Sequence, residues 1–106
     1  MNTAATKSSL SPARRKLVEL CQRVNFGRLE RLKVVGGEPV HDSRLRVVRE
    51  HKFCSQNGPR PEAGRWDCAL KSQHLELMQL LDEIGDGTIE VLTVKHGLPF
   101  HAELGG

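Results

Sequence analysis

Apolar side chains recur at helical spacing in two stretches of the chain, each preceded by a residue that suits a helix cap. In the first stretch Ser11 offers a capping hydroxyl and Pro12 suits the first helical position. In the second stretch Asp67 is the expected cap, and the glycines at 85–87 suit a helix stop. Two amphipathic helices are therefore expected. Their apolar stripes are Leu17, Leu20, Cys21 and Val24 in the first helix, and Leu70, Leu77, Leu80, Leu81 and Ile84 in the second.

A period of two follows each helix, which predicts half-buried strands over 28–35 and 88–95. The dipeptides Gly36-Gly37 and His96-Gly97 come next, and both suit a two-residue hairpin turn with positive φ. Each helix is therefore expected to lead into a β-hairpin. The expected return strands carry Leu45, Val47 and Val48 in the first hairpin, and Phe100, Ala102 and Leu104 in the second.

The two helix–hairpin stretches match each other without a gap when the chain is shifted by 60 positions. The match runs from Leu17 to His41 and from Leu77 to His101. Non-apolar residues recur identically within it, which two unrelated amphipathic segments would not share. We therefore interpret the chain as two copies of one unit. The recurring pairs are Gly27 and Gly87, Glu30 and Glu90, Gly37 and Gly97, Pro39 and Pro99, and His41 and His101.

The element order α-β-β-α-β-β predicts the α+β class. One helix–hairpin unit cannot bury its apolar side alone, so the two units are expected to share a four-stranded antiparallel sheet with both helices on one face. A strand-swapped dimer of the same units is the alternative. Residues 1–10 are expected to be a disordered tail, followed by one domain at 11–106. In this domain a loop at 54–66 joins the repeats 11–53 and 67–106. The loop is interpreted as a linker, and a functional loop is the alternative.

One stretch of the first unit resembles a known family. The residues Val24-Asn25-Phe26-Gly27-Arg28-Leu29-Glu30, followed by Gly37-Glu38-Pro39-Val40, are similar to the YezD-like family of small bacterial proteins. Each half of this chain corresponds to one such short protein, and the second half departs from the pattern with Asp86 in place of Phe26. The resemblance implies a helix followed by a hairpin and a bacterial origin, and it supplies no catalytic residues.

The composition narrows the location and the class of function. A length of 106 residues fits one domain, and no apolar run reaches the ~20 residues of a membrane helix. Residues 1–9 lack the apolar stretch of a signal peptide, so a cytoplasmic protein without a membrane partner is expected. Three cysteines do not make a disulfide framework. The net charge of +3 permits an anionic partner without requiring one.

Nucleic-acid binding is the favoured function, through a basic face of the sheet. If Leu32 and Val34 face the core, Arg31 and Lys33 face the other way. If Leu45 and Val47 also point inward, the return strand adds further cations to this face, and a stripe of this kind suits phosphate contacts. Aromatic side chains for base stacking are missing from it, so duplex backbone binding fits better. The expected site consists of Arg31, Lys33, Arg44, Arg46 and Lys52.

A protein-interaction module or a homodimerisation domain is the alternative function. Val35, Val48 and Val91 are expected on the outer face, which indicates a surface covered by a partner. The expected partners are therefore nucleic acid or another protein, and the chain is expected to be a monomer or a homodimer.

A small zinc-binding domain is the third reading. Four soft ligands lie on either side of the loop, but the spacing of the second pair is longer than zinc motifs use. Enzymatic activity and a cofactor are not expected, because no P-loop, G-x-S-x-G or H-E-x-x-H motif is present. The zinc ligands of this reading would be His51, Cys54, Cys68 and His74.

Overall fold

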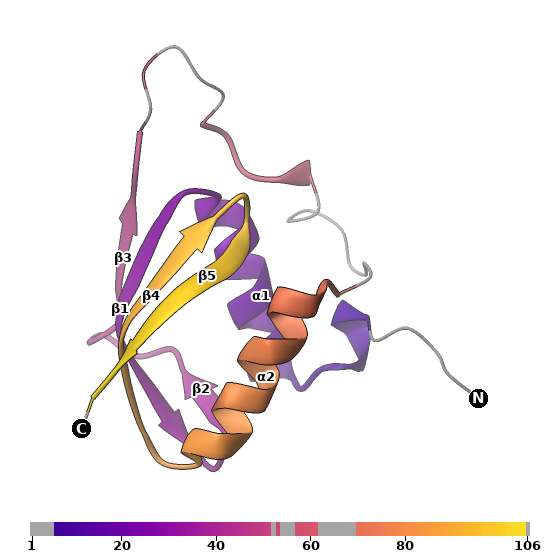
Figure 1. The fold of residues 1–106 in the computed structure, drawn as a ribbon, viewed down its shortest axis with the longest axis vertical. Coiled ribbons are helices and arrows are strands. Elements are labelled where there is room, and N and C mark those ends of the chain that lie inside the picture. Colours follow the sequence, from indigo (N-terminus) through magenta and orange to yellow (C-terminus); the bar gives the residue numbers. More distant parts are fainter. Residues whose placement is uncertain (1–5, 52, 54–56, 62–69, 106) are drawn as a thin grey trace.

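The structure is a computed structural model that describes residues 6–51, 53, 57–61 and 70–105. Two helices and an antiparallel sheet confirm the α+β class (Figure 1). In chain order the elements are the 3-10 helix η1 (Lys7–Ser9), helix α1 (Pro12–Val24), strands β1 (Gly27–Val35), β2 (Glu38–Val40) and β3 (Arg46–Arg49), helix α2 (Ser72–Ile84), and strands β4 (Gly87–Lys95) and β5 (Leu98–Leu104).

Helix α1 begins at the predicted residue, whereas α2 begins later than predicted. The Ser11 hydroxyl oxygen accepts a hydrogen bond of 3.2 Å from the backbone N–H of Arg14, which satisfies one of the free N–H groups of the first turn. The N-cap of α2 is Lys71, and the predicted cap Asp67 lies outside the described residues. The His74 Nδ1 accepts a hydrogen bond of 3.2 Å from the backbone N–H of Lys71. The imidazole of His74 therefore caps the first turn of α2.

The sheet has five strands in place of the four predicted. Its order is β2-β1-β4-β5, and β3 also pairs with β1. Strand β2 pairs with the last residues of β1 and β3 with the first, so residues 41–45 divide the return strand into two. Within them the backbone N–H of Leu45 bonds to the Asp42 carbonyl, and this turn takes the chain out of the ladder. One edge of the sheet is thus formed by β2 and β3, and the other by β5.

The two halves of the chain pair with symmetrical registers. Gly27 lies opposite Val94 and Val34 lies opposite Gly87, so the central pair of β1 and β4 reads the same from either half. The bounds of α1 and α2, and those of β1 and β4, differ by the 60 positions of the sequence match. Two backbone hydrogen bonds obey the same symmetry, from Gly37 to Gly85 at 2.8 Å and from Gly97 to Asn25 at 2.9 Å.

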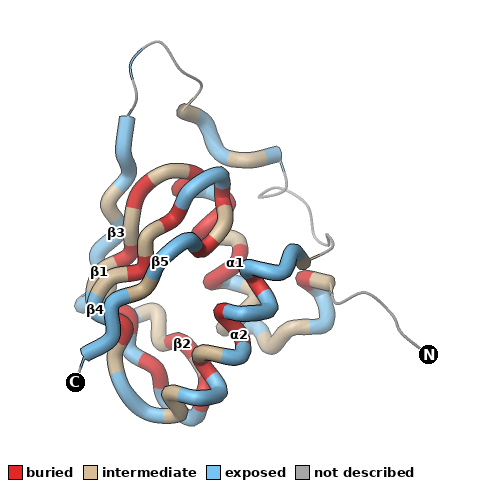
Figure 2. Tube along the Cα trace, viewed as in Figure 1, coloured by how far each residue is buried: buried red, intermediate tan, exposed pale blue. Residues whose placement is uncertain are grey.

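Both helices lie on the same side of the sheet (Figure 1), and Figure 2 shows the buried residues concentrated where the helices meet it. The predicted stripes omit Val18 and Met78, which occupy equivalent positions and are buried. The stripe residues Leu20, Leu70, Leu80 and Ile84 are only partly buried. The core consists of Leu17, Val18, Cys21, Val24, Leu29, Leu32, Val34, Leu77, Met78, Leu81, Ile89, Leu92 and Val94.

Residues 6–10, part of the predicted disordered tail, contain η1. Lys7 is 0% exposed, and its Nζ lies 3.9 Å from the Glu19 carboxylate on α1. Leu10 packs against the core. The aliphatic stem of Lys7 and the side chain of Leu10 thus fix this segment to α1, which the polar composition of the tail does not indicate.

Candidate nucleic-acid interface

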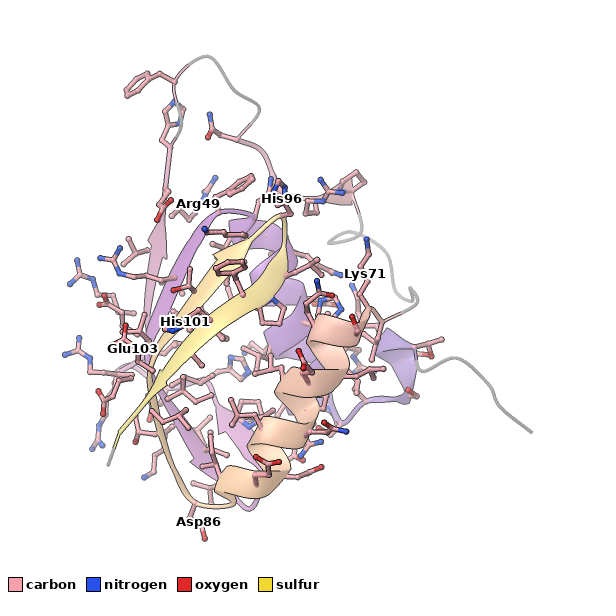
Figure 3. The ribbon with its side chains drawn as sticks, in the orientation of Figure 1. Arg49, Lys71, Asp86, His96, His101 and Glu103 are labelled. Carbon is pink, nitrogen blue, oxygen red and sulfur yellow. The ribbon has the colours of Figure 1, made fainter. Side chains whose placement is uncertain are left out.

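The face of the sheet that the helices leave uncovered carries the candidate site. Residues directly opposite each other in an antiparallel pair share a face. The partners of buried core residues therefore point toward the helices, and the residues between them point outward. Figure 3 shows side chains that end in nitrogen projecting from the β1 and β3 part of the sheet, away from α1 and α2.

Two outward residues stand next to each other in the middle of β1. Leu29 and Leu32 are both fully buried, so Glu30 and Arg31 lie between two inward positions. Arg31 has a φ of 59°, in the left-handed region that residues with a side chain rarely adopt. This residue breaks the alternation of the strand. Charged side chains are consequently denser on the outer side of β1 than a strict period of two would allow.

Strand β3 adds to this face because it comes very close to the start of β1. Gly27 lies opposite Arg49, and a Cβ on Gly27 would lie only 2.0 Å from the Val48 carbonyl oxygen. The missing side chain therefore permits the contact. In this register Arg46 lies opposite Glu30. Arg46 thus points outward, while Val47 pairs with the buried Leu29 on the helix side of the sheet and stays 42% exposed.

We call Arg28, Arg31, Lys33 and Arg46 the basic surface, and Glu30 lies in the middle of it. The Arg28 Nε donates a hydrogen bond of 2.7 Å to the Glu30 carboxylate, and the Arg46 Nε lies 3.7 Å from its other oxygen. The hydrogen bond from Arg28 is the main cause that lowers the pKa of Glu30, and the charges of the arginines act in the same direction. Glu30 is therefore ionised at neutral pH.

The arginines remain accessible despite these contacts. The side chains of Arg28 and Arg46 are 40% and 62% exposed, whereas that of Glu30 is 22% exposed. The carboxylate thus contacts both guanidinium groups, while the two arginine side chains keep a large exposed area. A guanidinium held in this way can donate to a phosphate in a fork geometry.

The second half of the sheet carries a different balance of charge. On the outer face β4 contributes Thr93 and Val91, and β5 contributes His101 and Glu103 opposite them. Glu90 and Lys95 are also exposed. The cations are therefore concentrated on the β1 and β3 side of the sheet.

The structure brings together three of the five predicted site residues. Arg31, Lys33 and Arg46 share the open face, whereas Arg44 lies in the turn before β3, where its backbone N–H donates to the Asp42 carboxylate at 3.0 Å. Lys52 lies outside the described residues. The sequence reasoning omitted Arg28 and Glu30. A strict period of two from Leu32 and Val34 places both residues on the core side, whereas the break in the alternation at Arg31 turns them to the open face. The register of β3 then puts Arg46 beside Glu30.

The predicted zinc ligands are only partly described. Cys54 and Cys68 lie outside the described residues, and His51 is exposed, with its ring 4.9 Å from that of Phe53. His74 is buried, its Nδ1 is bonded to the Lys71 N–H, and its Nε2 has no partner of normal hydrogen-bond geometry. Burial lowers the pKa of His74, and the charges of Lys71 and Lys7 act in the same direction. Within the described residues no group of three His, Cys, Asp or Glu could hold a metal ion.

The described cysteine, Cys21, has an unreactive thiol. Cys21 is fully buried in the core, and burial raises the pKa of its thiol to about 12. A thiol with this pKa stays protonated at neutral pH, and the thiolate is the reactive form. Cys21 therefore fills space as a small apolar side chain.

Residues 57–61 of the predicted linker lie against the end of α1. The Arg60 N–H donates to the Gln22 carbonyl at 2.9 Å, and the Asn25 side-chain amide donates to the Gly58 carbonyl at 3.0 Å. A pocket of about 350 Å³ opens here, lined by Asn25, Phe26, Gly58, Pro59, Arg60, Pro61 and His96.

Comparisons with models of protein families, with curated proteins and with solved structures find no match. Among the described residues, neither helix is long and apolar enough to cross a lipid bilayer.

Proposed function

We propose that this chain is a non-enzymatic domain that binds the phosphate backbone of nucleic acid through its basic surface. The observation that carries the proposal is the gathering of four cationic side chains from β1 and β3 on the sheet face that no helix covers. Arg28 and Lys33 are five positions apart on β1, which spans about 17 Å. One strand of a duplex carries a phosphate about every 3.4 Å along the helix axis, so several phosphates lie within reach of this surface.

The chemistry of the face favours backbone contacts over base reading. Arginine and lysine donate to phosphate oxygens without regard to sequence. The neighbouring outward positions hold Val48, Val91 and Thr93, none of which can stack on a base. A cytoplasmic location belongs to the same proposal, because nucleic acid is accessible there and free thiols such as Cys21 stay reduced.

We also propose that the two halves arose by duplication of one helix–hairpin unit. The shared element bounds, the symmetrical register of β1 and β4 and the two equivalent backbone hydrogen bonds support this origin. A repeated position then serves the fold, and a function is expected where the halves differ. The basic surface fits this expectation, because Thr88, Val91 and Thr93 of the second half stand at the positions of Arg28, Arg31 and Lys33. Arg46 lies beyond the stretch in which the two halves match.

The test is the salt dependence of binding to a short labelled DNA duplex, followed by fluorescence anisotropy. Three to four phosphate contacts predict a slope of log K against log salt of about −3. The double variant Arg31→Gln/Lys33→Gln is expected to make this slope shallower by about 2. The matched control is Lys16→Gln/Arg23→Gln, which removes the same charge from exposed positions of α1 on the other side of the sheet.

The control separates a located site from general charge attraction. The proposal predicts that the α1 variant keeps the wild-type slope. Equal losses in the two variants would show that only net charge matters. Absence of binding at low salt would refute nucleic-acid binding altogether.

A further inference from the structure

Strand β5 is a free edge of the sheet. It pairs with β4 on one side, and within the described residues nothing pairs with its other side. The opposite edge of the sheet is interrupted between β2 and β3, whereas β5 runs without a break from Leu98 to Leu104. An unpaired strand edge is a template for another strand.

The side chains of residues 101–104 of β5 alternate between the two faces of the sheet. Ala102 and Leu104 lie opposite the buried Leu92 and Ile89, so they point to the helix side. His101 and Glu103 lie on the open face, and Figure 3 shows them on the side of β5 away from α2. Phe100 and Leu104 are 65% and 50% exposed, which is unusual for large apolar side chains on an edge.

An apolar groove of about 120 Å³ runs between β5 and α2. Its apolar lining places the exposed Phe100 beside the partly buried Leu80. Added apolar surface along β5 would cover this groove. The lining residues are Gln73, Glu76, Leu77, Leu80, Leu92, Pro99, Phe100, His101 and Ala102.

We propose that a second copy of this chain pairs with β5 in antiparallel orientation, about a twofold axis at Ala102. The sequence of β5 is complementary to itself in this register. The imidazole of His101 lies opposite Glu103 of the partner subunit, and Ala102 faces its own counterpart. The pair of His101 and Glu103 is favourable, and it occurs twice because the interface is isologous.

Other registers lose this complementarity. A shift by two residues places either two histidines or two glutamates opposite each other. After a shift by one residue, each outward side chain of one copy would lie opposite a residue of the other copy that points to the helix side. Pro99 has no N–H to donate, and the ladder with β4 is irregular at Phe100, which lies between the paired residues Pro99 and His101. A second irregularity lies between Ile89 and Val91 of β4. Pairing is therefore expected to centre on residues 101–103.

The first test measures the mass of the chain by light scattering over a range of concentrations, without nucleic acid. The wild-type protein is expected to show twice the mass of one chain. His101→Glu places two carboxylates opposite each other and is expected to weaken association at least about tenfold. The swap His101→Glu/Glu103→His restores both opposite pairs in this register and is expected to restore the dimer. Circular dichroism checks that these exposed substitutions leave the fold intact.

The second test is a cross-link that reads the register. In a Cys54→Ser/Cys68→Ser background, Ala102→Cys faces its own counterpart across the twofold axis and is expected to form a disulfide-linked dimer on oxidation. The control Thr93→Cys lies on β4, inside the sheet, and is expected to stay monomeric. A monomeric wild-type protein would overturn the proposal. A dimer that ignores the charge swap and fails to cross-link at Ala102 would overturn the β5 assignment.

Discussion

Gly27 is the point at which β3 comes closest to β1, so replacing it tests the strand that carries Arg46. A Cβ on Gly27 would lie 2.0 Å from the Val48 carbonyl oxygen and 3.0 Å from the Arg49 Cα. Both neighbours are backbone atoms, so they can give way only if β3 moves. The φ of Gly27 is 155°, which residues with a side chain rarely adopt. Gly27→Ala is therefore expected to push β3 away from the start of β1.

The size of the effect follows from two contributions. Forcing an extra methyl group into a packed site costs about 1–3 kcal/mol. Holding a side chain in a sparsely populated backbone region costs about 1–3 kcal/mol more. The sum of about 2–6 kcal/mol is a large part of the roughly 5–15 kcal/mol by which domains of this size are stable. If β3 detaches instead, the loss is limited to the pairing of its four residues.

The equivalent glycine of the second half provides a matched control. A Cβ on Gly87 would meet only the Ile84 Cγ2, at 3.1 Å, and that side chain can turn away. Gly87→Ala is therefore expected to change the free energy of unfolding by less than about 1 kcal/mol. Urea unfolding followed by far-ultraviolet circular dichroism measures both. Equal losses, or a Gly27→Ala loss below about 1 kcal/mol, would refute the packing of β3 on Gly27.

Three further predictions follow from the charges and burial described above. Glu30→Gln removes the negative charge from the middle of the basic surface and is expected to tighten duplex binding at low salt, whereas Glu90→Gln, the equivalent change on β4, is expected to have a smaller effect. Anisotropy titrations decide, and equal effects of the two changes would count against the role of Glu30. Burial lowers the pKa of His74 below its unfolded value of 6.5, so the unfolded state takes up the proton first and stability is expected to fall as the pH drops below about 6.5. His74→Gln is expected to weaken this pH dependence in urea unfolding, and an unchanged dependence would contradict the role of His74. Cys21, as the single thiol of a Cys54→Ser/Cys68→Ser variant, is expected to react with Ellman's reagent only in denaturant, and rapid reaction in the native protein would contradict its burial.

Features set by neighbours along the chain could be predicted from the sequence. Ser11 and Pro12 mark the start of α1 because capping involves only the first turn of a helix. The two hairpin turns follow from dipeptides that accept positive φ, which Gly36 and His96 adopt at 58° and 54°. The shared face of Arg31 and Lys33 follows from the period of the strand. In each case the cause lies within a few residues.

Features set by contacts between distant segments could not be predicted in this way. The division of the return strand depends on the turn at Asp42 and on the approach of β3 to Gly27, and neither leaves a periodic signal. The place of Glu30 within the basic surface depends on the break in the alternation of β1 at Arg31 and on the register of β3. The anchoring of η1 depends on a buried lysine, which a count of polar residues assigns to solvent.

The two ends of the molecule show how one framework carries different surfaces. At one end the Asp86 carboxylate accepts a hydrogen bond of 2.9 Å from the backbone N–H of Gly36. At the other end the equivalent positions hold Phe26 and His96, whose rings pack edge to face at 4.8 Å. Residues 57–61 lie against this second end alone. Equivalent backbone positions thus carry different side-chain contacts, a hydrogen bond at one end and a ring contact at the other, on the same backbone framework.

The return strands of the two halves also differ in surface chemistry. This difference allows nucleic-acid binding and pairing through β5 to be tested separately. In the first half the return strand is divided, and β3 is basic, so it enlarges the charged face. In the second half β5 is continuous and exposes Phe100 and Leu104, so it is suited to pair with another strand. Charge reversal at Arg46 should therefore weaken binding to nucleic acid without changing the mass of the particle. Charge reversal at the edge, by His101→Glu, should lower the mass, while each separated chain keeps its basic surface.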